Sequence, residues 1–152
     1  MDKPKGYTDY LDVSQDISDR ILNNLYAFVD FDSFCDLLNS KNLTYTRISR
    51  CLLHILLDIT SEKMAAYQQM DYIPFIKMLG FRKDSAPLLN AITDNAKAPL
   101  ISKLSHAKSY LPPEANAMLE DEIRMSDVYQ SILSQKCGLP MMNEFRTPLV
   151  II

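Results

Sequence analysis

The spacing of apolar and polar positions predicts that most of the chain is helical. Apolar residues recur every three or four positions in five segments, residues 14–28, 34–40, 44–59, 62–70 and 111–138. Ser, Thr or Asp residues stand near the start of the first four segments, where their oxygens can accept hydrogen bonds from free backbone amides. The pattern therefore predicts a series of helices that each turn one apolar face toward a core.

A different pattern begins at residues 72–81, YIPFIKMLGF. This run is short, apolar and rich in Ile and Phe, which predicts a strand with Pro74 at an edge. Residues 82–97 have helical spacing with Asp84 as the expected cap, and residues 98–103 form a second short apolar run. Strand, helix and strand in this order predict a βαβ unit with parallel strands and a right-handed crossover.

The predicted fold class is mainly α with a small βαβ element, an α+β arrangement, in a single compact helical domain over residues 1–152. The tail at residues 145–152 is expected to dock as an extended edge. Apolar residues make up 47% of the chain and charged residues 23%, which excludes general disorder. A chain of 152 residues is long enough for one domain that buries about two-thirds of its unfolded surface.

Three cysteines at wide spacing indicate neither a disulfide framework nor a zinc ribbon. Cys35, Cys51 and Cys137 include no CxxC pair, and an odd number fits a reducing compartment. The first residues lack the apolar core of a signal peptide, and no apolar run approaches the roughly 18 residues of a membrane span. We therefore expect a cytoplasmic protein with no membrane contact.

The net charge of -3 conceals a strong segregation of charge along the chain. Residues 1–40 hold eight acids and three bases, residues 41–108 hold ten bases and five acids, and residues 109–152 hold six acids and three bases. The basic middle predicts an anionic partner such as a nucleic acid. Pairing of the same bases with the acidic flanks inside the protein is the alternative.

The usual signatures of catalytic and metal sites are absent from the sequence. The chain contains no GxGxxG, GxxxxGK[ST], HExxH or GxSxG motif, and its three glycines cannot form a glycine-rich phosphate loop. Cys51 and His54 have the spacing of half a zinc site, but no second pair completes it. Glu120, Asp121 and Glu122 diverge around a helix, so a solvated face explains them better than a metal site. We expect no catalytic residues and no metal in this chain.

Basic residues that could bind phosphate occur at two places. Arg47, Arg50 and His54 follow one another at helical spacing and form a basic edge beside the apolar stripe that contains Ile48. Tyr45 falls on the apolar side by helical angle, which predicts that it packs in the core. Ion pairs between the arginines and the acidic first segment remain the alternative.

The second place is the predicted strand-to-helix turn, GFRKDS. Arg82 and Lys83 precede the helix, whose first amides and positive dipole end attract anions, and Lys103 follows the next strand. The alternative is that Asp84 already caps these amides and that the bases are only solvated.

Several segments in order resemble the C-terminal region of the tRNA(Met) cytidine acetate ligases, a nucleotidyltransferase-like family. They are YLDVSQDISDRI, SKNLTYTRISRCLLHILLDIT, YIPFIKMLGFRKDSAPLL, APLISK and NEFRTPLVII. Two motifs carry the resemblance most specifically, a Tyr-Thr-Arg-x-x-Arg helix and a Leu-Gly-Phe turn. Their residues here are Tyr45, Thr46, Arg47, Arg50, Leu79, Gly80 and Phe81.

The resemblance implies an enzyme that activates acetate with ATP, as its complex with Mg, and transfers the acetyl group to the wobble cytidine of elongator tRNA(Met). In that family ATP binds an N-terminal half with an HxGH-type motif, and neither His54 nor His106 lies in such a motif. We therefore expect residues 1–152 to be a C-terminal domain without the catalytic half, inactive alone and without a cofactor of its own.

The expected partners are tRNA and the N-terminal catalytic domain. From their charge we infer that Arg47, Arg50, His54, Arg82, Lys83 and Lys103 hold tRNA phosphates. A structural or dimerisation domain that supports the catalytic half without touching tRNA is the alternative, and it leaves a homo-oligomer open.

Overall fold

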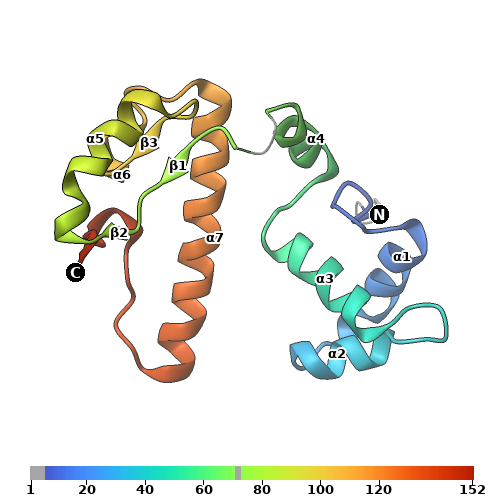
Figure 1. The fold of residues 1–152 in the computed structure, drawn as a ribbon. Coiled ribbons are helices and arrows are strands. Elements are labelled where there is room, and N and C mark those ends of the chain that lie inside the picture. Colours follow the sequence, from blue (N-terminus) through green and yellow to red (C-terminus); the bar gives the residue numbers. More distant parts are fainter. Residues whose placement is uncertain (1–5, 71–72) are drawn as a thin grey trace. The chain divides into compact units, whose positions relative to one another are not determined.

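The structure is a computed structural model that describes residues 6–70 and 73–152, and it divides into two compact units (Figure 1). Unit 1 is Met1–Gln69 and unit 2 is Met70–Ile152. The predicted class is confirmed, because the described chain is mainly helical with small parallel pairs of strands. No helix in this part of the chain has the length and apolar character needed to cross a membrane.

In its described residues, unit 1 consists of helices joined by turns, with two isolated β-bridges. Its elements are α1 (Gln15–Asn24), the 3-10 turn η1 (Leu25–Ala27), α2 (Phe31–Leu38), α3 (Tyr45–Leu56) and α4 (Ser61–Gln69). Side-chain oxygens of Ser14, Asp30, Thr44 and Thr60 accept hydrogen bonds from the backbone amide three residues later. These bonds confirm the caps expected from the sequence and explain where each helix begins.

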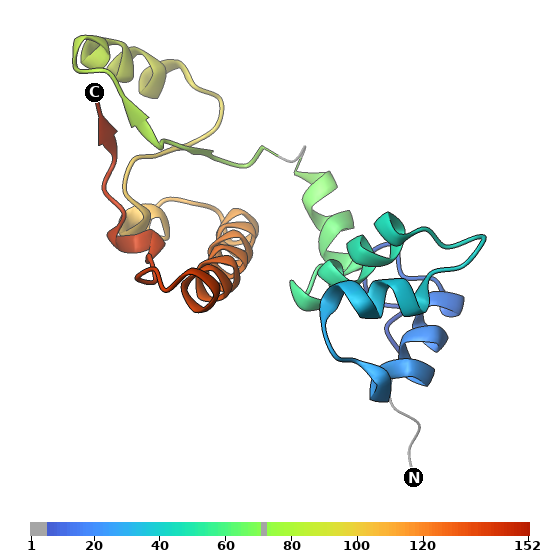
Figure 2. The ribbon, with the colours of Figure 1, turned by 90° about the horizontal axis from the view of Figure 1, so that it is seen from below.

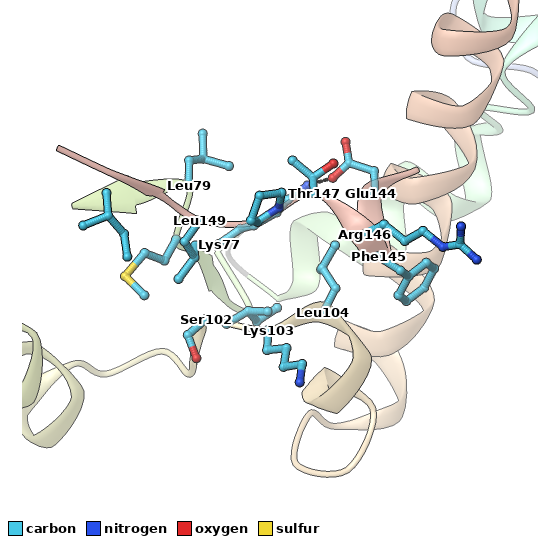
Figure 3. A pocket seen from close by; sticks show the side chains of 14 residues that line it. Lys77, Leu79, Ser102, Lys103, Leu104, Glu144, Phe145, Arg146, Thr147 and Leu149 are labelled. Atoms are coloured by element: carbon cyan, nitrogen blue, oxygen red, sulfur yellow. Dashed lines mark ion pairs between the residues drawn. The ribbon is translucent and has the colours of Figure 1, made fainter. Parts of the chain in front are cut away.

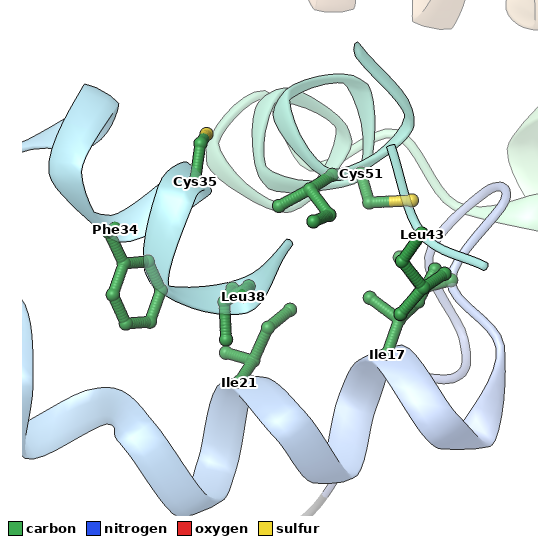
Figure 4. Packing of buried hydrophobic residues seen from close by; sticks show 9 residues of the cluster. Ile17, Ile21, Phe34, Cys35, Leu38, Leu43 and Cys51 are labelled. Atoms are coloured by element: carbon green, nitrogen blue, oxygen red, sulfur yellow. The ribbon is translucent and has the colours of Figure 1, made fainter. Parts of the chain in front are cut away.

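The core of unit 1 forms where α1, α2 and α3 meet. Figure 4 shows Ile17 and Ile21 of α1 facing Leu38 and Leu43, with Cys51 of α3 in the same cluster. The spacing predicts that the apolar stripe of Ile48 continues through Leu52, Ile55, Leu56 and Ile59, and this is only partly right. Ile48 is buried and Leu52 and Ile55 pack against the cluster, but Leu56, the last residue of the helix, is exposed.

Unit 2 combines two small parallel sheets with one long helix. Its elements are β1 (Ile76–Lys77), β2 (Gly80–Phe81), the 3-10 turn η2 (Lys83–Ser85), α5 (Ala86–Asn95), β3 (Leu100–Ile101), α6 (Leu104–Ala107), α7 (Pro113–Cys137), the 3-10 turn η3 (Glu144–Arg146) and β4 (Val150–Ile151). α7 lies within the predicted helical segment 111–138; Pro113 begins it and Gly138 ends it in the left-handed conformation.

The predicted strand at residues 72–81 is two separate strands with different partners. β1 pairs with β3, with Ile76 opposite Leu100, which confirms the parallel βαβ order. β2 pairs with β4, with Gly80 opposite Val150, so the tail docks as an extended edge as predicted (Figure 2). Tyr72, the first residue of the predicted strand, lies outside the described residues.

The core of unit 2 joins the first sheet to the helices. Its buried residues are Ile101, Ala107, Leu111, Ala115, Leu119 and Ile123, with Phe75 and Leu104 packed against them. The first half of α7 therefore faces this core, whereas Tyr129 and Ile132 in its second half are exposed.

Gly80 sits where two backbones approach closely. A β-carbon added there would clash with the carbonyl oxygen and the β-carbon of Val150. We expect Gly80→Ala to separate β2 from β4 and to lower the free energy of unfolding by about 1–3 kcal/mol. Amide hydrogen exchange should then be faster at Val150 and Ile152, whose N–H groups donate to Leu79 and Phe81. Leu79→Ala is the control, because Leu79 is exposed and its substitution should leave exchange at these amides unchanged. Exchange in Gly80→Ala as slow as in the wild type would contradict the prediction.

Candidate nucleic-acid interface

Helix α3 carries the basic edge predicted from the sequence. Thr44 starts the helix, so Arg47, Arg50 and His54 follow one another along one side of it. Arg47 is exposed, and no described acid forms an ion pair with it. Arg47 is thus free to meet an external anion.

Arg50 and His54 hold a turn of unit 1 instead. Arg50 Nε lies 2.9 Å from Asp12 Oδ2, and His54 Nδ1 lies 2.7 Å from the carbonyl oxygen of Leu11. Cys51 Sγ also donates to the carbonyl oxygen of Asp12 at 3.3 Å. Three residues of α3 therefore fix the Leu11–Asp12 turn, as the internal-pairing alternative expects. The Arg50 side chain is still 55% exposed, so part of it remains accessible from outside.

Tyr45 does not pack in the core, contrary to the prediction from helical angle. Its side chain is partly exposed and its hydroxyl donates to Asp32 Oδ1 at 2.7 Å. This hydrogen bond to a carboxylate raises the pKa of Tyr45 to about 12. The tyrosine of the Tyr-Thr-Arg motif therefore ties α3 to α2.

The basic turn after β2 is held by the tail of the chain. The N–H of Lys83 donates to the carbonyl oxygen of Ile152 at 2.8 Å, which continues the β2–β4 pairing into the turn. Arg82 and Lys83 are exposed, and no described acid pairs with either. The prediction that Asp84 caps the helix is wrong. α5 starts one 3-10 turn later, after Ser85, with no side-chain cap.

Lys103 lies at the start of α6 and lines a cavity of about 420 Å³ (Figure 3). β1, β3, η3 and the tail enclose this cavity within unit 2. Phe145 and Arg146 also line it, although the sequence did not point to them as site residues. In the sequence these two residues stand out only as a Phe-Arg pair at the start of the tail. Their place at the cavity becomes apparent only from the pairing of the tail with β2.

A charged network supports one wall of the cavity. Lys77 Nζ lies 2.8 Å from Glu122 Oε1 and 3.0 Å from Glu144 Oε2, and Ser126 Oγ donates to Glu144 Oε1 at 2.7 Å. The Ser126 hydrogen bond lowers the pKa of Glu144, partial burial opposes it, and Lys77 lowers it further. Burial alone would lower the pKa of Lys77, but the two carboxylates together raise it.

The candidate residues thus belong to two sets. Arg47, Arg50 and His54 lie on α3 of unit 1, whereas Arg82, Lys83 and Lys103 lie in unit 2. In the described chain no group of three His, Cys, Asp or Glu residues has the geometry of a metal site.

At Asp12 the contribution of backbone strain to stability can be measured separately from that of the ion pair with Arg50. Asp12 has φ of 64°, a left-handed conformation that glycine adopts without cost. Asp12→Ala and Asp12→Gly both remove the carboxylate that binds Arg50, so we expect Asp12→Ala to be less stable than Asp12→Gly by about 1 kcal/mol. Urea unfolding followed by circular dichroism measures the difference. An Asp12→Ala protein as stable as Asp12→Gly would show that the turn is not strained.

The low pKa of Glu144 predicts an acid dependence of stability. A carboxylate whose pKa is lower in the folded protein stabilises the fold fully at pH values above 4.5, the ordinary pKa of the group. This stabilisation is lost as the pH falls through the folded pKa. Wild type should therefore exceed Glu144→Gln in unfolding free energy at pH 6, and this difference should shrink as the pH falls below about 4.5 toward the lower folded pKa. Urea unfolding over this range is the measurement, with Glu114→Gln on the exposed first turn of α7 as the control. A difference that does not change with pH would contradict it.

Comparison with known proteins gives the relationships of the chain. The family model described as "HIGH Nucleotidyl Transferase" matches residues 1–142. A tRNA(Met) cytidine acetate ligase of Clostridium perfringens is 26% identical over 85% of this chain and 30% of its own length. One from Bacillus cereus is 24% identical over 95% of this chain and 35% of its own length.

Solved structures agree with this relationship at the level of fold. A crystal structure of Thermotoga maritima TmcAL bound with alpha-thio ATP has a TM-score of 0.81 at 16% identity, and the match covers 95% of this chain and 37% of that one. The apo form also has a TM-score of 0.81. The chain therefore spans about a third of the length of these relatives. Because the family model covers most of its residues, the chain belongs to the HIGH nucleotidyl transferase family.

Proposed function

We propose that this chain is the C-terminal, RNA-binding part of a cytoplasmic tRNA(Met) cytidine acetate ligase. The observation that carries the proposal is the set of exposed cations without a described acid partner, Arg47, Arg82, Lys83 and Lys103, in a chain whose relatives are such ligases. Cations of this kind bind RNA phosphates because binding releases the counterions condensed on the RNA.

The chemistry belongs to the rest of such a ligase. An N-terminal catalytic part would bind ATP with Mg, activate acetate as acetyl-adenylate and transfer the acetyl group to the wobble cytidine. The chain described by this structure would contribute phosphate contacts that position the tRNA, without reading bases through its cations.

The six cations expected from the sequence divide by role in this proposal. Arg47, Arg82, Lys83 and Lys103 contact phosphate. Arg50 and His54 are engaged by the Leu11–Asp12 turn and mainly hold α3 in place, and Arg50 adds a phosphate contact through the exposed part of its side chain.

A second function is favoured by a separate observation on unit 1. The segment Leu25–Val29 exposes a continuous apolar stretch, in which Tyr26 is 88% and Val29 is 82% exposed. Apolar surface of this kind is typical of contacts with protein. It supports the alternative that unit 1 buttresses the catalytic part or contacts a second copy.

Binding of a tRNA(Met) transcript to the 152-residue chain tests the proposal. We expect Arg47→Ala and the double variant Arg82→Ala, Lys83→Ala to weaken binding. Each phosphate that is no longer bound should also reduce the slope of log affinity against log salt by about one. Filter binding or fluorescence anisotropy at several salt concentrations gives both quantities.

Arg20→Ala is the matched control, because Arg20 is already paired with Asp16 one helical turn away. It should leave affinity and salt slope close to wild type. Wild-type affinity and slope in the Arg47 and Arg82, Lys83 variants would contradict the proposal and favour the protein-contact alternative.

A further inference from the structure

The cavity of unit 2 combines an apolar floor with a cationic rim. Met78, Ile101, Leu104 and Leu149 supply apolar lining, and Lys103 and Arg146 lie at its border. Figure 3 shows Phe145 and Arg146 extending from η3 and Lys103 extending from the start of α6. At about 420 Å³ the cavity has the size of an ordinary small-molecule site.

The charge available to a ligand at this cavity is positive. Lys103 and Arg146 are exposed and have no described acid partner. Glu144 also lines the cavity, but Lys77 binds one of its oxygens and Ser126 donates to the other. Lys77 shares its one charge between Glu144 and Glu122, so Glu144 is held by contacts within the protein without being fully neutralised. An anionic ligand would meet Lys103 and Arg146, which have no described acid partner.

An aromatic side chain stands at the same place. Phe145 is 49% exposed although it lines the cavity, so one part of its ring is available to a ligand. An exposed aromatic ring flanked by cations is the arrangement that binds single-stranded nucleic acid, because any base can stack on the ring while the cations hold the phosphates.

The turn that carries Phe145 is fixed before any ligand binds. The Phe145 N–H donates to Asn143 Oδ1 at 2.9 Å, and the Arg146 N–H donates to the carbonyl oxygen of Asn143 at 3.0 Å. Ser126 and Lys77 hold Glu144, the first residue of the turn. A fixed turn reduces the entropy cost of binding.

The cavity lies beside the strand pair that leads into the basic turn after β2. Ile151 lines the cavity and lies opposite Phe81, whereas Arg82 lines a separate neighbouring hollow with Val150 and Ile152. The cations that line the cavity and have no described acid partner are therefore Lys103 and Arg146.

We propose that this cavity binds one unpaired nucleotide of RNA, with its base stacked on Phe145 and its flanking phosphates on Lys103 and Arg146. The proposal rests on the proposed RNA-binding function and extends it from phosphate contacts to recognition of an unstacked base. An acidic peptide is a poorer match, because it would use the cations and leave the aromatic ring without a role.

Fluorescence anisotropy with two labelled RNAs tests the site on the 152-residue chain. One probe is a 10-nucleotide single-stranded RNA of mixed sequence, and the other is a blunt duplex that contains the same strand. Phe145→Ala should weaken single-strand binding about 5- to 100-fold and change duplex binding little, because only the single strand has a base free to stack. Phe145→Trp should retain single-strand binding, since the larger ring still stacks.

Tyr129→Ala is the matched control, because Tyr129 is a more exposed aromatic residue on α7 outside the cavity lining. It should bind both probes as wild type does. Lys103→Gln and Arg146→Gln should each weaken single-strand binding and reduce its salt slope.

Three outcomes would overturn the site. They are unchanged single-strand binding in Phe145→Ala, an equal loss for both probes, and displacement of the single strand by a poly-glutamate peptide at equal concentration. The proposed function fails separately, when the Arg47 and Arg82, Lys83 variants bind tRNA as wild type does. If those variants bind tRNA more weakly while Phe145→Ala binds the single strand as wild type does, the proposed phosphate contacts stand and only the nucleotide site is refuted.

Discussion

The ion pairs of Lys77 hold the parts of unit 2 together. Lys77 is only 18% exposed and joins β1 to Glu122 of α7 and to Glu144 of η3. These three segments share no backbone hydrogen bonds among the described residues, so side chains hold them together. The ammonium group acts with the Ser126–Glu144 hydrogen bond and the apolar core to fix the tail turn against the sheet and the long helix. A partly buried ammonium is tolerated because two carboxylates compensate its desolvation. The cavity and its aromatic rim depend on this arrangement.

In unit 1, charged side chains also hold distant segments together, but one basic residue of α3, Arg47, takes no part in these contacts among the described residues. Arg50 and His54 fix the Leu11–Asp12 turn, and Tyr45 ties α3 to Asp32. The acidic first segment and the basic middle of the chain therefore meet inside this unit. Arg47, on the same helix, remains exposed. One helix thus combines residues that stabilise the fold with a residue that suits an external anion.

Local features of the structure and the parallel order of β1 and β3 were predictable from the sequence, whereas the partners of most distant segments were not. The caps at Ser14, Asp30 and Thr44 act over three residues, so composition and spacing reveal them. The pairing of β2 with β4 and the contact between Arg50 and Asp12 join segments far apart in the chain, and no periodicity encodes them. For this reason the sequence identified Lys103 as a candidate but missed Phe145 and Arg146 beside the same cavity.

The position of β4 affects the order in which the protein can form. During synthesis on a ribosome, Gly80 emerges long before Val150, its partner in the second sheet. Until residues 147–151 are available, the edge of β2 is unpaired and the cavity lacks the wall that they form. Unit 1 draws its core from residues 13–51 and can fold much earlier. Nascent chains would thus carry a folded helical unit while the cavity of unit 2 is still incomplete.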